Sequence, residues 1–154
     1  MKRTKSCTIA LLIIVAFILC NSLIPGETSN AISDKITTLV GGTVPAMSET
    51  EVADIPWLTT GTVRKLAHIM EFAALGLTAA LLVLFRGKRI GGQLPNLLLL
   101  GLGVGIMDET IQIFTNRTSM IEDVWIDLLG FGLGLLLLWL VSAAIRYKKG
   151  ARPQ

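Results

Sequence analysis

The chain has 154 residues, of which 52% are hydrophobic and only 16% are charged. Soluble domains average about 45–50% apolar and about 25% charged residues, so a single-domain membrane protein is the first class to consider. The formal net charge is +3, but lysines and arginines lie in short clusters at the ends of apolar runs, and aromatic residues make up only 6% of the chain. Charges that set membrane orientation explain this pattern, and we expect no nucleic-acid partner.

Four apolar runs follow one another along the chain, at residues 7–24, 63–85, 94–114 and 121–145. Each is close to the length of about 20 residues with which a helix crosses about 30 Å of hydrocarbon. Open strands cannot span lipid, because their backbone groups would stay unpaired. The sequence therefore predicts an all-α membrane protein with four transmembrane helices.

The basic residues are distributed unevenly over the loops. Ten of the 14 precede the first run, separate the second from the third, or follow the fourth: Lys2, Arg3, Lys5, Arg86, Lys88, Arg89, Arg146, Lys148, Lys149 and Arg152. The positive-inside rule then places both termini in the cytoplasm. The basic loop between the second and third runs is expected to meet anionic lipid.

The first run has a second interpretation, as a secretory signal peptide with a basic start and an apolar middle. Its length, and the absence of a small-x-small cleavage site near Ile24, favour a retained helix.

Residues 25–62 form the one long connection, which the orientation places outside. Pro25 and Gly26 end the first helix, and Ser29 and Asn30 are candidate N-caps for a short helix that stops at the Gly41-Gly42 pair. Its apolar residues have helical spacing: Ile32, Ile36, Leu39 and Val40. This pattern fits an amphipathic helix on the outer leaflet, with a loosely ordered loop as the alternative.

Ionisable residues interrupt three of the four apolar runs at a similar depth. His68, Asp108 and Asp127 each lie five or six residues from the outer end of their run, roughly 7–10 Å below the membrane boundary at 1.5 Å per residue. Placing an ionisable group at the bilayer centre costs roughly 2.5–3.5 kcal/mol, so we expect each of them to be paired, hydrated or part of a functional site. Taken singly, His68 fits a hydrogen-bonded bundle histidine, and the two aspartates fit ion-pair partners. Their shared depth favours a common site.

The spacing of the polar residues places them on one stripe of each helix, because neighbours are three or four residues apart. The stripes are Arg64, His68 and Glu71; Asp108, Glu109 and Gln112; and Asp123, Asp127, Gly130 and Gly134. Gly130 and Gly134 form a small-xxx-small pattern that permits close helix approach, and Gly101, Gly103 and Gly105 could do the same on the third run. Meeting glycine faces would bring the acidic ends together beside His68 and Arg117.

These residues also carry a resemblance to a known family. The segment RKLAHIMEFAALG at 64–76, the DExxQ pattern at 108–112, and Arg117, Asp123 and Asp127-x-x-Gly130 resemble the VanZ-like family of small bacterial membrane proteins. The resemblance covers about residues 64–140. The namesake is associated with resistance to the glycopeptide antibiotic teicoplanin, which implies a bacterial plasma-membrane protein that acts at the cell envelope.

The resemblance also implies a set of site residues and a division of the chain. The family's characteristic positions correspond to Lys65, His68, Glu71, Asp108, Glu109, Gln112, Arg117, Asp123, Asp127 and Gly130. Two positions depart from the family pattern: Asn116 stands where a glycine is common, and Phe72 where a tyrosine is common. We divide the chain into a first helix with its outer loop (1–62), a VanZ-like three-helix core (63–145) and a basic cytoplasmic tail (146–154).

The first functional hypothesis is a non-enzymatic envelope protein with an outward-facing polar pocket. The pocket would bind a lipid-linked cell-wall precursor or a glycopeptide antibiotic, or change the membrane surface that the antibiotic must reach. Arg64, Lys65 and Arg117 would contact phosphate or carboxylate, and the acids would position them.

The second hypothesis is an intramembrane hydrolase or transferase that acts on a lipid-linked substrate. His68 or Glu71 would be the general base, while Asp108, Glu109 and Asp127 would hold a divalent cation such as Mg²⁺. Arg117 would bind an anionic group. The sequence contains no nucleophile motif and no tight ligand spacing such as HExxH.

A third hypothesis is proton or ion conduction through the buried acids. The polar residues stop in the outer half of the helices, so this hypothesis ranks below the other two.

Overall fold

The computed structural model describes residues 2–42, 59–115 and 121–150. Four of its helices are long and apolar enough to cross a membrane: α1 (Lys2–Ser22), α4 (Thr60–Phe85), α5 (Leu94–Phe114) and α6 (Ile121–Gly150). A single 3-10 turn, η1 (Gly91–Gln93), precedes α5. The prediction of an all-α protein with four spanning helices is confirmed.

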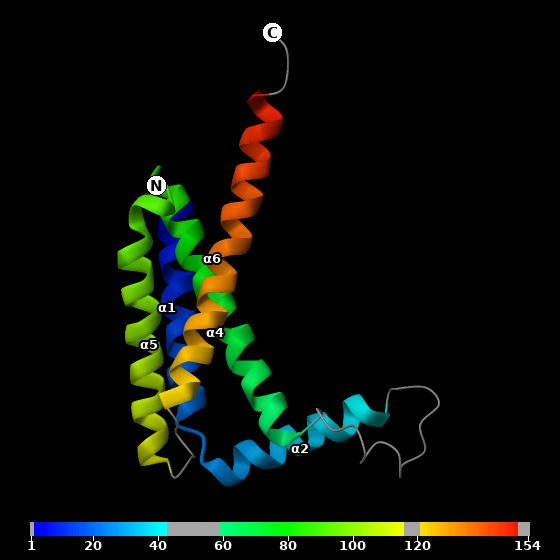
Figure 1. Ribbon diagram of the computed structural model, residues 1–154. Helices are drawn as coiled ribbons and strands as arrows, with labels where there is room; N and C mark the ends of the chain where they lie inside the picture. Colours follow the sequence, from blue (N-terminus) through cyan, green and yellow to red (C-terminus); the bar gives the residue numbers. More distant parts are fainter. Residues whose placement is uncertain (1, 43–58, 116–120, 151–154) are drawn as a thin grey trace.

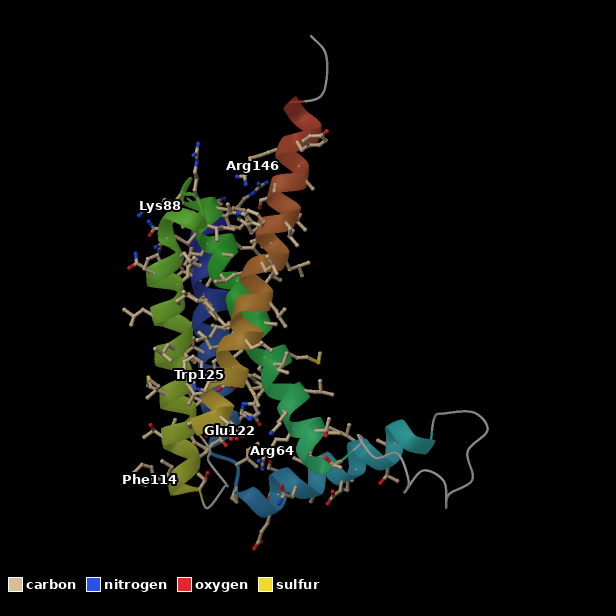
Figure 2. All side chains as sticks on the ribbon, in the orientation of Figure 1. Arg64, Lys88, Phe114, Glu122, Trp125 and Arg146 are labelled. Atoms are coloured by element: carbon tan, nitrogen blue, oxygen red, sulfur yellow. The ribbon has the colours of Figure 1, made fainter. Side chains whose placement is uncertain are left out.

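The four long helices run alternately up and down. In Figure 1, α1 and α5 descend, while α4 and α6 return, so the start of α1 and the end of α6 lie toward the same end of the bundle. The loop between α4 and α5, with Lys88, lies at that end as well, as does Arg146 of α6 (Figure 2). The basic segments are therefore gathered at one end, and its location in the cytoplasm stays a prediction.

A shorter helix, α2 (Gly26–Gly42), lies across the opposite end of the bundle (Figure 1). It begins directly after Pro25, whose carbonyl oxygen accepts a hydrogen bond from the Ser29 amide at 3.0 Å. The prediction that Ser29 or Asn30 caps this helix is therefore wrong, because both lie inside it. Ile32, Ile36 and Leu39 are exposed, which is the arrangement expected of a helix that rests on a membrane surface.

The contact between α4 and α6 depends on glycine. A Cβ atom at Gly134 would overlap the carbonyl oxygen of Ala73, and one at Gly76 would overlap the carbonyl oxygen of Phe131. A Cβ atom at Gly130 would lie 2.6 Å from the carbonyl oxygen of Ile69. The close approach predicted for Gly130 and Gly134 is confirmed, and their partner is α4.

The glycines of α5 behave differently from one another. A Cβ atom at Gly101 would lie 2.8 Å from the Phe131 ring, and one at Gly105 would lie 3.5 Å from Asp127, but a Cβ atom at Gly103 would meet nothing within 4 Å. A packing role for Gly103 is therefore wrong, because this residue faces away from the other helices.

An apolar core joins all four long helices. Its most buried side chains include Ile18 of α1, Phe72 and Leu75 of α4, Val104 of α5 and Phe131 of α6. Because Ile18 is fully buried there, α1 is packed into the bundle. Phe72, one of the two departures from the pattern that the resemblance implies, is also fully buried among apolar neighbours.

Candidate functional site

Polar side chains from all four long helices meet at the end of the bundle where α2 lies. There α1 and α5 end, while α4 and α6 begin (Figure 1). We call this group the polar cluster; its members are Asn21, Ser22, His68, Glu71, Asp108, Glu109, Gln112 and Asp127.

The centre of the polar cluster is an imidazole between two carboxylates. His68 Nδ1 lies 3.2 Å from Asp127 Oδ1 and 3.5 Å from Asp108 Oδ2. The His68 side chain is 12% exposed, and both aspartates are fully buried. The convergence of these three residues from three helices is confirmed, while what they bind stays a prediction.

The side-chain amide of Gln112 bridges two neighbouring acids on α5 by hydrogen bonds. Gln112 Nε2 donates hydrogen bonds to Asp108 Oδ2 at 2.9 Å and to Glu109 Oε1 at 3.1 Å. All three side chains are buried. Because the amide donates to both carboxylates, it lowers the cost of placing them side by side in the membrane.

Helix α1 supplies two residues that the sequence interpretation missed. The Ser22 hydroxyl donates to Asp108 Oδ1, and Asn21 Nδ2 donates to Glu71 Oε1 at 2.9 Å. Thr115, at the end of α5, also donates to the Ser22 carbonyl oxygen at 3.1 Å. Asn21 and Ser22 lie only two or three residues from the outer end of the first run, nearer the boundary than His68, and the depth argument considered only ionisable residues. A search for any polar side chain near the outer ends of the four runs would have found them.

Two carboxylate oxygens of α6 have no hydrogen-bond partner within the part of the chain that the structure describes. They are Asp127 Oδ2 and Asp123 Oδ1, and both atoms are buried. Asp127 as a residue has no exposed surface. A buried, unpartnered carboxylate oxygen is costly and calls for a ligand, a water or an ion.

The basic residues expected near the acids are placed differently. Lys65 is exposed, Arg64 is half-buried, and neither forms an ion pair with any residue in the described ranges. Within those ranges, His68 forms an ion pair with Asp108 and with Asp127. Arg117 and Asn116 lie outside the described residues.

Charge is unbalanced in the polar cluster. Glu71, Asp108, Glu109 and Asp127 supply four carboxylic groups, against one imidazole. Buried carboxylates are stabilised when protons, basic groups or a bound cation offset their charge. The ligand atoms of His68, Asp108 and Asp127 lie within 4.8 Å of one another, close enough to surround one metal ion. Carboxylate oxygens suit Mg²⁺ and Mn²⁺, and the imidazole adds affinity for transition metals.

Two further residues of α6, the predicted Gly130 and the acid Glu122, have other surroundings. Gly130 packs against the α4 backbone and carries no ligand atom. Glu122 is exposed near the start of α6 (Figure 2).

Comparison with known proteins identifies one family. A family model described as VanZ/LLP1 matches residues 7–142. Neither the curated proteins nor the solved structures include a match to this chain. The matched region includes α1 from Cys7 onward, and it contains every residue of the polar cluster.

Proposed function

Because this chain belongs to the VanZ/LLP1 family, we propose that it is a multi-pass protein of the bacterial plasma membrane whose polar cluster binds a divalent cation. Through the cation it holds an anionic group of a lipid-linked envelope component. The observation that carries this proposal is the meeting of ligand atoms from His68, Asp108 and Asp127 within 4.8 Å of one another. The unpartnered Asp127 Oδ2 supports it, because a cation is the natural partner of a buried carboxylate oxygen.

The position of the polar cluster suggests the kind of ligand. It lies at the ends of membrane-spanning helices, at the end of the bundle that α2 crosses (Figure 1). Helix α2 exposes the apolar side chains of Ile32, Ile36 and Leu39. A ligand that reaches this level needs an apolar anchor in the bilayer and a polar group near its surface. The carboxylates alone would repel an anionic group, and a bridging cation would remove that repulsion. Holding such a component at the outer surface would also change the access of a glycopeptide antibiotic to it.

The test is a cation titration of the purified protein in phosphatidylcholine nanodiscs. We expect Mn²⁺, followed by electron paramagnetic resonance, to bind at one site per chain and Mg²⁺ to compete for it. A polyprenyl diphosphate should then bind at least about tenfold more tightly with Mg²⁺ than with a chelator, as bridging by the cation requires. Absence of a stoichiometric cation site would refute the whole proposal. A cation site with no effect on diphosphate binding would refute the bridging role.

The enzymatic alternative is favoured by the surroundings of Glu71. Glu71 lies one helical turn after His68 on α4, is half-buried, and accepts the hydrogen bond from Asn21 Nδ2 at 2.9 Å. It is therefore an oriented carboxylate beside the three candidate ligands and separate from them. Such a group is placed to act as a general base. A bound divalent cation would supply an activated water for hydrolysis of a lipid-linked substrate.

Replacing Glu71 by glutamine tests this alternative. If the protein is an enzyme, Glu71→Gln should lower phosphate release from a polyprenyl diphosphate by about 10²–10⁴-fold, the usual contribution of a general base. Cation affinity should change little, because Glu71 is not one of the three ligands. Glu122→Gln, which replaces an exposed carboxylate on α6, is the control. Wild-type protein that releases no phosphate would exclude this reaction and leave the binding proposal standing.

Ion conduction receives no support from the described core. Deeper than the polar cluster, the residues between the helices are apolar: Ile18, Phe72, Leu75, Ala79, Phe131 and Leu135. A charged species would meet a barrier there.

A further inference from the structure

A polar recess lies at the end of the bundle opposite the polar cluster, beside the α4–α5 loop. A cavity of about 280 Å³ opens between that loop and α6 and is lined by Leu84, Arg89, Ile90, Trp139, Ser142 and Arg146. This is the end of the bundle at which Lys88 and Arg146 are labelled in Figure 2. Both arginines are exposed, and neither forms an ion pair with a carboxylate among residues 2–42, 59–115 and 121–150.

An apolar groove continues from this recess toward the middle of the bundle. It has a volume of about 270 Å³, shares Ile90 and Trp139 with the recess, and runs between α5 and α6. Its other side chains are those of Leu94, Leu98, Leu135 and Leu136, and Gly132 leaves its floor open. The two hollows therefore form one elongated site, with guanidinium groups at one end and aliphatic groups along the rest.

The chemistry of the two parts specifies the occupant. Guanidinium groups bind phosphate oxygens through paired hydrogen bonds, and the Ser142 hydroxyl and Trp139 indole N–H can add donors. Trp139 at the junction is typical of the interface between headgroups and acyl chains. An inorganic anion would use the recess and leave the groove empty. A molecule with an anionic phosphate and an acyl chain would use both.

We propose that Arg89 and Arg146 bind the phosphate of an anionic phospholipid, whose acyl chain lies in the α5–α6 groove. The site is separate from the polar cluster and lies at the opposite end of the bundle. If that end faces the cytoplasm, as the distribution of basic residues predicts, the lipid belongs to the inner leaflet.

Native mass spectrometry with phosphatidylglycerol and phosphatidylcholine of identical acyl chains tests the proposal. We expect one phosphatidylglycerol to bind wild-type protein in preference to phosphatidylcholine. Arg89→Gln and Arg146→Gln should each weaken phosphatidylglycerol binding by about fivefold, since each basic group near an anionic surface contributes about that factor. Lys88→Gln is the control, because Lys88 is an exposed neighbour outside the recess lining.

A separate variant tests whether the acyl chain occupies the groove. Gly132→Leu should fill it and weaken binding of both lipids by about tenfold, because acyl methylenes lose apolar contact. Circular dichroism should show native helix content, and Leu98→Phe replaces this variant if Gly132→Leu does not fold. An equal effect of Lys88→Gln and Arg89→Gln would overturn the proposal in favour of diffuse electrostatic attraction. Unchanged binding in a folded groove variant would remove the acyl-chain part, and displacement of the lipid by millimolar inorganic phosphate would identify a simple anion site.

Discussion

Replacing Gly134 by alanine should destabilise the bundle by about 1–3 kcal/mol, the usual cost of overpacking, or by more because backbone must move. The added methyl would overlap the Ala73 carbonyl oxygen and would lie 2.7 Å from the Leu77 backbone nitrogen. Side chains can change rotamer to make room, but two packed helix backbones can only separate. Such a separation would pull Asp127 away from His68, which lies across the same helix pair.

The measurement is unfolding in mild detergent with increasing dodecyl sulfate, followed by circular dichroism. Gly103→Ala is the matched control, because a Cβ atom there meets nothing within 4 Å. Alanine is favoured over glycine in helices by about 0.8–1.0 kcal/mol, so the control should be neutral or slightly stabilising. Equal stability of the two variants would show that the glycine contact between α4 and α6 is not required. Loss of cation binding in Gly134→Ala, but not in Gly103→Ala, would link the α4–α6 contact to the geometry of the polar cluster.

Replacing Asp127 by asparagine should abolish cation binding while leaving the fold intact. The substitution keeps the shape of the side chain but removes the negative charge and one of the two ligand oxygens. Changes next to metal ligands already cost about 10–100-fold in affinity, so loss of a ligand should reach about 100-fold or more. Without cation, the variant should be at least as stable as the wild type, because one buried carboxylate near Asp108 has been removed.

Two measurements separate these effects. Mn²⁺ titration reports the affinity, and unfolding in the presence of a chelator reports the stability without cation. Glu122→Gln removes an equivalent charge from an exposed position on the same helix and should change neither quantity. An unchanged Mn²⁺ affinity in Asp127→Asn would contradict the proposed cation site. If Glu122→Gln lowered the Mn²⁺ affinity by the same factor, the cation would be attracted by the overall negative charge and not bound at a specific site.

The spanning helices were predictable because hydrocarbon imposes a length and a composition on any segment that crosses it. The third run was expected at 94–114, and α5 occupies Leu94–Phe114. The continuation of α6 beyond residue 145 was not expected. Most of residues 146–150 are basic or polar, and hydropathy shows only where a segment leaves the apolar layer. A helix can continue past that point, as α6 does to Gly150.

Depth in the membrane was also predictable, and it brought His68, Asp108 and Asp127 to one level. It follows from counting residues along helices of constant rise. The contribution of Asn21 and Ser22 was missed because the family resemblance began only at residue 64 and because neither side chain is ionisable. The structure shows them donating to Glu71 and Asp108, which makes α1 part of the polar cluster.

From its residues alone, this protein was bound to be a bundle of four membrane-crossing helices with acids and one imidazole near one surface. Hydrophobic length and the cost of buried charge allow little else. The spacing marked a polar or glycine stripe on three of the helices, but it left open which helix each stripe faces and which glycines of α5 make contact. Packing settled both: Gly101 and Gly105 face α6 while Gly103 does not, and the glycine face of α6 lies on α4. Those contacts, made between residues far apart in the chain, place the imidazole of His68 between its two carboxylates.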